Sequence, residues 1–331
     1  MKNNDIPVLV ISFNRPDTTK ELLLALKKVN IKELYVFIDG PRKESIQKDL
    51  NSINKIKKTI EDVVDWGCNL KIKSSAVNLG CGLGPIEAIT WFFENVDEGV
   101  ILEDDCIPSA SFFDYVAELL DKYRDKKEIF LISGDNGNIL PKKYFKENSY
   151  LFSQIPLIWG WASWCDRWSK FDNDLSYWNK GYKKNSSKLS NFKFFERVAL
   201  FSIFRSAASI NVKNFWDYQF FSTMIKEKSL CIIPKNNLIQ NIGWGESATH
   251  TKKENFRSFA EVEEVNTIIH PEKILSEINI DNYISYKIHH GVSKLILESN
   301  FLFLYRISYL FRRGTYKLEV LFQYFKSKIL N

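Results

Sequence analysis

The sequence has few of the residues that mark common redox and metal sites. Its five cysteines are odd in number and include no CxxC pair, so neither a disulfide framework nor a cysteine zinc site is expected. The four histidines show no HExxH spacing, and no GxSxG elbow indicates a serine hydrolase. A cysteine set of this kind fits a reducing cytoplasm best.

Long apolar runs are missing as well. No stretch approaches the ~18 apolar residues that a membrane span requires, and the opening MKNND carries no apolar signal region. We therefore expect a protein that is neither exported nor membrane-spanning. With 331 residues, 45% of them apolar and 15% aromatic, the chain can still bury a substantial core.

Positive charge is concentrated at one end of the chain. The formal net charge is +6, and residues 294–331 carry seven Lys and Arg against two Glu, so most of the excess lies there. Leucines and aromatics alternate with these cations, which is typical either of peripheral contact with an anionic membrane or of packed helices with a solvated basic face. Nucleic-acid binding is disfavoured, because no recognised motif accompanies the charge.

Short β-branched runs alternate with helical patterns through residues 1–136. Such alternation predicts right-handed βαβ crossovers and an α/β fold with a mainly parallel, doubly wound sheet. Strands are expected at 7–13, 34–40, 70–76, 99–105 and 129–135, and helices at 21–28, 46–65, 85–95 and 111–124.

The rest of the chain changes character. From about 150 to 250 we expect aromatic-rich loops with one further strand at 230–234 and a helix after Asp217, so residues 137–255 are predicted to be an acceptor-binding half of the same domain. Residues 256–331 are predicted to be a helical, basic C-terminal tail.

Three consecutive acids follow an apolar run in GVILEDDCIP (99–108). Along a strand, Glu103 and Asp105 would share one side and Asp104 the other. Adjacent carboxylates repel each other unless a cation or hydroxyl donors are present, and oxygen ligands of this kind suit Mg²⁺ or Mn²⁺. A metal that bridges to a diphosphate is the interpretation we favour; the alternative is a loop of solvated acids.

Polar residues also follow the other expected strands, at the edge where ligands of doubly wound sheets bind. Arg15 in SFNRP could contact phosphate or base, although a lone arginine is more often a surface residue. Asp39 could accept from a nucleobase N–H or simply form an Asp-Gly turn. NLGCGLG (78–84) has GxGxG spacing, which argues against a dinucleotide fingerprint and favours a glycine-rich turn near a phosphate or an ordinary loop.

Two aromatic segments are candidates for the acceptor side. In NFWDYQFF, Asp217 lies between aromatic residues, where a carboxylate can serve as a general base; N-capping of the following helix is the competing interpretation. Four tryptophans in ten residues (159–168) could stack on sugar rings or fill the core. Residues 241–253 have the composition of a loop that closes over phosphates, or of an ordinary surface loop.

Together these motifs resemble GT-A fold glycosyltransferases, which use nucleotide-sugars, and more narrowly the N-acetylglucosaminyltransferase I type with its bacterial relatives. The resemblance spans roughly residues 7–251 and rests on SFNRP (12–16), IDG (38–40), VILEDDCIPSASFFDY (100–115), GW (160–161), FWD (215–217) and GWGESATHT (243–251). The chain departs from the type at Tyr218, where relatives carry a second acid, and in the 78–91 stretch.

The resemblance implies a role for each matched residue. Asp105 would ligate Mn²⁺ or Mg²⁺, Asp104 would contact the ribose, Glu103 would support the donor sugar, and Asp217 would be the catalytic base. Arg15 and Asp39 would hold the uracil. The remaining implied donor contacts are Ser12, Asn14, Asn78 and His250, and the implied acceptor contacts are Trp159, Trp161, Trp216 and Glu246.

The sequence therefore predicts an inverting, metal-dependent glycosyltransferase of the cytoplasm. Its donor would be a UDP-sugar, with N-acetylglucosamine a candidate, and its acceptor a hydroxyl of a glycan or glycolipid in bacterial surface synthesis. Two alternatives stay open: a nucleotidyltransferase that makes sugar nucleotides, and a non-catalytic carbohydrate-binding protein on the same fold.

Overall fold

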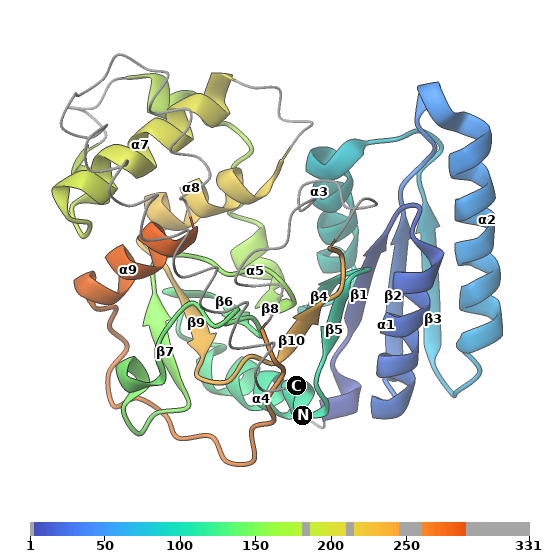
Figure 1. Ribbon diagram of the computed structural model, residues 1–331, viewed down its shortest axis with the longest axis horizontal. Coiled ribbons are helices and arrows are strands. Elements are labelled where there is room, and N and C mark those ends of the chain that lie inside the picture. Colours follow the sequence, from blue (N-terminus) through green and yellow to red (C-terminus); the bar gives the residue numbers. More distant parts are fainter. Residues whose placement is uncertain (1–2, 181–185, 210–214, 245–259, 289–331) are drawn as a thin grey trace, which may run out of the picture.

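The structure is a computed structural model that describes residues 3–180, 186–209, 215–244 and 260–288 (Figure 1). An eight-stranded mixed sheet runs through its centre in the order β3-β2-β1-β4-β8-β6-β9-β7, and a separate ribbon pairs β10 with β5. The strands are β1 (Val8–Ser12), β2 (Glu33–Ile38), β3 (Asn69–Ser74), β4 (Glu98–Glu103), β5 (Cys106–Pro108), β6 (Ile129–Ser133), β7 (Tyr150–Ser153), β8 (Trp161–Trp164), β9 (Leu230–Pro234) and β10 (Ile239–Asn241).

The sheet is mainly parallel, as predicted. Strands β3, β2, β1 and β4 pair in parallel, and β6 pairs in parallel with β9. Strand β8 is antiparallel to both β4 and β6, so these two strands run in the same direction, and β7 is antiparallel to β9. The fold is therefore α/β and Rossmann-like, with β7, β8 and β9, which all follow residue 136, built into the same sheet.

Helices cover both faces of the sheet. Alternate residues of β1 point in opposite directions: Val8 and Val10 pack with Leu22 and Leu26 on one face, whereas Leu9 packs with aromatic residues of α3 on the other. Figure 1 shows α1 and α2 beside β1–β3, with α7, α8 and α9 at the opposite end. The longer helices are α1 (Pro16–Val29), α2 (Ile46–Val63), α3 (Gly80–Phe93), α4 (Ala110–Tyr123), α7 (Phe194–Ser209), α8 (Asp217–Glu227) and α9 (Ile278–Ile288); α5 (Cys165–Trp168) is a single turn.

Two expectations about loops are wrong. The tryptophan-rich segment was predicted as loop, but Trp161–Trp164 forms β8, which is buried along its whole length between β4 and β6. A strand that has neighbours at both edges and is covered on both faces has no polar side. Its sequence therefore lacks the apolar–polar alternation from which a strand is predicted. The glycine-rich stretch is also not a turn: α3 begins at Gly80, five residues before the expected start.

The predicted helical tail is only partly correct. Residues 260–277 contain no helix, and α9 follows them; residues 289–331 lie outside the described part of the chain. Helix α9 attaches to β7 through buried Asp281, whose Oδ1 accepts hydrogen bonds from Ser153 Oγ (2.7 Å) and the backbone N–H of Gln154 (3.1 Å). Burial raises the pKa of Asp281 to about 6.

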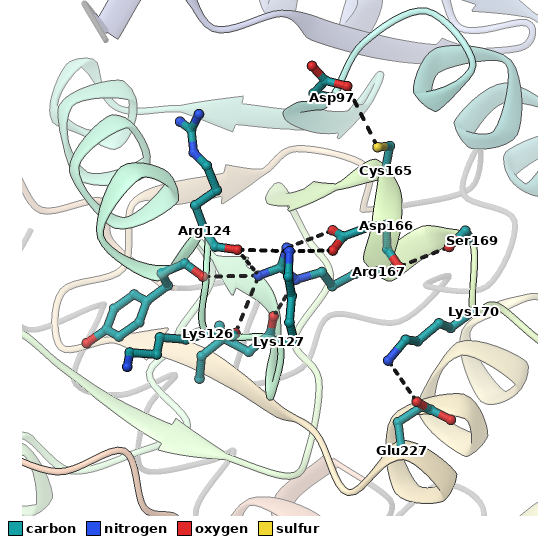
Figure 2. A network of polar contacts seen from close by, with 12 residues as sticks. Asp97, Arg124, Lys126, Lys127, Cys165, Asp166, Arg167, Ser169, Lys170 and Glu227 are labelled. Atoms are coloured by element: carbon teal, nitrogen blue, oxygen red, sulfur yellow. Dashed lines mark hydrogen bonds and ion pairs between the residues drawn. The ribbon is translucent and has the colours of Figure 1, made fainter.

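A buried arginine in α5, which directly follows β8, forms hydrogen bonds with the end of α4. Arg167, only 2% exposed, donates to the carbonyls of Tyr123 (3.0 Å), Arg124 (2.7 Å) and Ile129 (3.2 Å), and to Asp166 Oδ1 (2.7 Å) (Figure 2). Its guanidinium carbon also lies 4.1 Å from the ring centroid of Trp164. The guanidinium therefore links the carbonyls at the C-terminal end of α4 to that of the first residue of β6.

Two further points concern chemistry and location. All five cysteines are free thiols. Within the described ranges, none of the helices has the length and apolar character needed to cross a bilayer.

Candidate functional site

The three acids Glu103, Asp104 and Asp105, which we call the acid turn, lie where β4 turns into β5. Strand β4 ends at Glu103, and Asp104 and Asp105 form the turn, so the expected alternation of the three side chains along one strand is wrong. Backbone hydrogen bonds fix this turn from two sides: Asp104 N–H donates to Ile11 O (3.0 Å), and Ile242 N–H donates to Asp105 O (2.9 Å). The acids therefore lie at the carboxyl end of β1 and β4.

Arg15 holds two of the acids together. Its guanidinium donates from one nitrogen to Asp105 Oδ2 (2.7 Å) and from the other to Asp104 Oδ1. Ser12 Oγ donates to the second oxygen of Asp104 (3.3 Å). Both aspartates are at least 90% buried, so this is a largely desolvated pairing of one cation with two carboxylates. Contact of Arg15 with uracil stays a prediction.

The buried carboxylates differ from free ones in their proton affinity. Burial, together with the negative charge of Asp105, raises the pKa of Glu103 to about 8. Burial also raises the pKa of Asp104, to about 6, although the neighbouring Arg15 opposes the shift. At neutral pH Glu103 therefore favours its protonated form, which can donate a hydrogen bond.

Asp217 lies within electrostatic reach of this cluster. It is the first residue of α8, the N-cap position is Trp216, and the carboxylate is half-buried, so the capping interpretation is wrong in detail. Its negative charge raises the pKa of Glu103 and that of the exposed Cys81 at the start of α3. Residues more than a hundred positions apart in the chain thus gather at one edge of the sheet.

Asp39 organises the loop before α3. Its Oδ1 accepts from the N–H groups of Gly40 (2.8 Å) and Leu79 (2.9 Å), and its Oδ2 from Gly80 N–H (3.0 Å) and Asn78 Nδ2 (3.0 Å). These bonds explain why α3 begins at Gly80: the carboxylate caps the helix start from another strand. Contact of Asp39 or Asn78 with a nucleobase stays a prediction.

Asn14 turns to a second polar centre, which the sequence analysis missed. Asn14 Nδ2 donates to Asp49 Oδ1 (3.1 Å), and Arg42 donates to the same carboxylate from Nε and Nη2 (both 2.8 Å). Asp49 is fully buried, and the hydrogen bonds from Arg42 hold its pKa well below the usual range. The available signal was its place on the apolar stripe of α2, in line with Ile53 and Ile56.

The predicted acceptor residues divide into three groups. Trp161 and Trp216 are 1% and 4% exposed and stack on each other at 6.0 Å, so the role visible for both rings is core packing. Trp159 is half-buried and lies edge-on to Trp244 at 5.6 Å, which leaves acceptor contact as a prediction for it. Glu246 lies outside the described residues, as does His250, which was predicted to contact the donor.

The carboxylates of the acid turn can be compared with the ligands that a divalent cation takes in proteins. Across the residues that the structure describes, no group of three or more His, Cys, Asp or Glu side chains is arranged to hold a metal. The chemistry of the turn nevertheless fits Mg²⁺ or Mn²⁺, which take one or two carboxylates and draw their other ligands from substrate phosphates and water. Asp105 is the residue that fits this pattern, once Arg15 moves aside.

Gly243 is required by the acid turn. A Cβ atom on this residue would lie 2.0 Å from Asp105 Oδ2 and 2.9 Å from Arg15 Nη1, far below contact distance. We predict that Gly243→Ala displaces the Asp105 carboxylate and destabilises the fold by about 1–3 kcal/mol. Gly67→Ala is the matched control, because nothing lies within 4 Å of its added Cβ. Equal unfolding midpoints in urea for the two variants would contradict the prediction.

Comparison with known proteins gives little beyond the architecture. No protein-family model matches the chain, and no curated protein matches it. Among solved structures, mouse xyloside xylosyltransferase 1 in its apo form matches with a TM-score of 0.32 and 10% identity, over 68% of this chain and 82% of its own. A Bacillus anthracis chain described as a glucose-1-phosphate thymidylyltransferase, in complex with sucrose, matches with a TM-score of 0.30 and 12% identity, over 50% and 74%. At scores this low, neither likeness fixes a function.

Proposed function

We propose that the protein is an inverting, metal-dependent glycosyltransferase of the GT-A type that transfers a sugar from a nucleotide-sugar to an acceptor hydroxyl. The observation that carries the proposal is the buried acid turn at the carboxyl end of β4, with the half-buried Asp217 in electrostatic reach of it. Ligands of open α/β sheets bind at this edge. A donor diphosphate and an acceptor hydroxyl would meet there.

Asp105 would hold the divalent cation, Mn²⁺ or Mg²⁺, together with the donor diphosphate. When bound, such a cation neutralises negative charge on the departing nucleotide. Asp104, held by Ser12 and Arg15, would accept a hydrogen bond from the ribose. Glu103, protonated at neutral pH because burial raises its pKa to about 8, would donate to a hydroxyl or carbonyl oxygen of the donor sugar.

Asp217 would act as the general base. As the first residue of α8 it lies within electrostatic reach of the acid turn, so it would take the proton of an acceptor hydroxyl while the nucleotide departs on the other side. Attack from the face opposite the leaving group inverts the anomeric carbon. The aromatic packing around Trp216 keeps the helix start in place.

The finer assignments follow from the resemblance. The donor would be a UDP-sugar, with N-acetylglucosamine as the candidate, and the acceptor a glycan or glycolipid of the bacterial surface reached past Trp159. The reaction would take place in the cytoplasm, and the basic segment 294–331 would provide peripheral membrane contact.

The test is thermal stabilisation by a panel of UDP-, GDP-, dTDP- and CMP-sugars with and without Mn²⁺. We expect one nucleotide class to raise the melting temperature of the wild type in the presence of Mn²⁺, because a ligand that binds only the native state stabilises it. Asp105→Ala should lose this shift.

Asp65→Ala is the matched control, since Asp65 forms an exposed pair with Lys27 away from the acid turn. It should keep the full shift. A wild type that folds well and responds to no sugar nucleotide would reject the proposal and favour a non-catalytic protein. Turnover of a sugar phosphate with a nucleoside triphosphate would favour a nucleotidyltransferase.

A further inference from the structure

We infer that Arg15 is an internal counter-ion of the acid turn, which occupies Asp105 in the free protein and is exchanged for the divalent cation when the donor binds. The inference rests on the proposed function and assigns a positioning role to Arg15 within the same site. We expect the cation and the diphosphate to bind together. The diphosphate would take the guanidinium of Arg15, and Asp105 would then be available to the cation.

The first support is the geometry of the pairing. One guanidinium nitrogen donates to Asp105 Oδ2 at 2.7 Å while the other donates to Asp104, so a single cation bridges both carboxylates. A guanidinium does not lose its proton in proteins, so Arg15 releases Asp105 only by moving.

The second support is that only the side chain of Arg15 needs to move. Its carbonyl accepts from Thr19 N–H (3.1 Å) and Thr19 Oγ1 (2.8 Å), which fixes the backbone at the N-cap of α1. The side chain is 22% exposed, whereas those of Asp104 and Asp105 are 3% and 11% exposed. The guanidinium therefore has a path towards solvent that the buried carboxylates lack.

The third support is the crowding at Asp105 Oδ2. This oxygen contacts Arg15 on one side, and on another it faces Gly243 so closely that an added Cβ would lie 2.0 Å from it. A divalent cation held by this oxygen would compete with the guanidinium for it. Metal and arginine are thus competitors for one ligand.

The competition predicts cooperative binding. In the absence of donor, a cation must displace Arg15 and leave the guanidinium without an anionic partner at Asp105. A diphosphate removes this cost, because its oxygens accept from guanidinium N–H groups as well as carboxylates do. Cation and diphosphate should therefore each raise the affinity for the other by the same factor.

The test measures Mn²⁺ binding to the full chain without donor, by calorimetric titration or by the spin resonance of free Mn²⁺. We expect Arg15→Gln to bind Mn²⁺ about 5- to 150-fold more tightly than the wild type, the range of typical coupling between ligands. Arg15→Lys, which keeps a positive charge, should stay close to the wild type. Arg124→Gln is the control, since Arg124 pairs with Glu98 (2.8 Å) at the opposite end of β4, and its Mn²⁺ affinity should be unchanged.

Unchanged or weaker Mn²⁺ binding by an Arg15→Gln protein that melts cooperatively would overturn the inference. If Arg15→Gln does not fold, the wild type decides: Mn²⁺ affinity that does not rise on addition of UDP, in a protein that UDP stabilises, would overturn it equally. Tighter Mn²⁺ binding by Arg15→Gln without a response to any sugar nucleotide would support the exchange while rejecting the proposed function.

Discussion

Replacing Asp217 by asparagine should lower the turnover number about 10²- to 10⁴-fold and leave donor affinity nearly unchanged, because the amide keeps the shape of the carboxylate but cannot take a proton at neutral pH. Asp217 lies at the start of α8 within electrostatic reach of the acid turn, and as the proposed base it would act in the reaction step and not in donor binding. Release of the nucleoside diphosphate from the donor found in the thermal panel measures turnover.

Glu227→Gln provides the control for Asp217→Asn. Glu227 ends the same helix and pairs with Lys170 (3.0 Å) on the surface, so this change neutralises an acid of α8 far from the site. Its turnover should match that of the wild type. Wild-type turnover in Asp217→Asn would remove Asp217 as the base, and a parallel loss of donor affinity would make it a binding residue.

Replacing Arg167 by methionine should destabilise the protein by about 3 kcal/mol or more. The change removes the hydrogen bonds that a buried guanidinium donates to the carbonyls of Tyr123, Arg124 and Ile129, and a hydrogen bond to a charged group contributes about 1.5–3 kcal/mol. Methionine is flexible and fills part of the space, so the loss reflects hydrogen bonding more than volume. Urea unfolding followed by tryptophan fluorescence measures the change.

Lys170→Met is the matched control for Arg167→Met. The two cations are neighbours in sequence, but Lys170 is exposed and makes a single surface ion pair with Glu227 (Figure 2), which contributes at most about 1 kcal/mol. A loss of similar size in both variants would show that the buried network around Arg167 adds nothing beyond surface charge.

The sequence predicted the strands and helices of residues 1–136, because the hydrophobic pattern of a strand differs there from that of a helix. Strand β1, for example, lies one residue inside its predicted range at either end, and α2 falls within two residues of its predicted end. The bounds of such elements depend on the local hydrophobic pattern, which can be seen in a single sequence. The role of Asp217 as the base, which the resemblance implies, stays a prediction.

The sequence did not predict which charges pair over long distances. Arg15 and Asp104 are separated by 89 positions, and Asp49 lies in the middle of α2 where a solvated acid would also fit. Strand β8 was missed for a related reason: its neighbours, β4 and β6, cover both of its edges, and none of this is written in its own residues. Only the folded sheet brings these partners together.

The position of β8 has a consequence for the order in which the protein assembles. Strand β8 lies between β4 and β6, although both precede it in the chain, so the first six strands leave β4 and β6 without a common neighbour until residue 164 is available. During synthesis the early half of the chain would therefore leave the ribosome with open strand edges that invite wrong pairing. The joining of β4 to β6 waits for the insertion of β8, and Arg167, three residues further on, fixes that strand through its hydrogen bond to the end of α4.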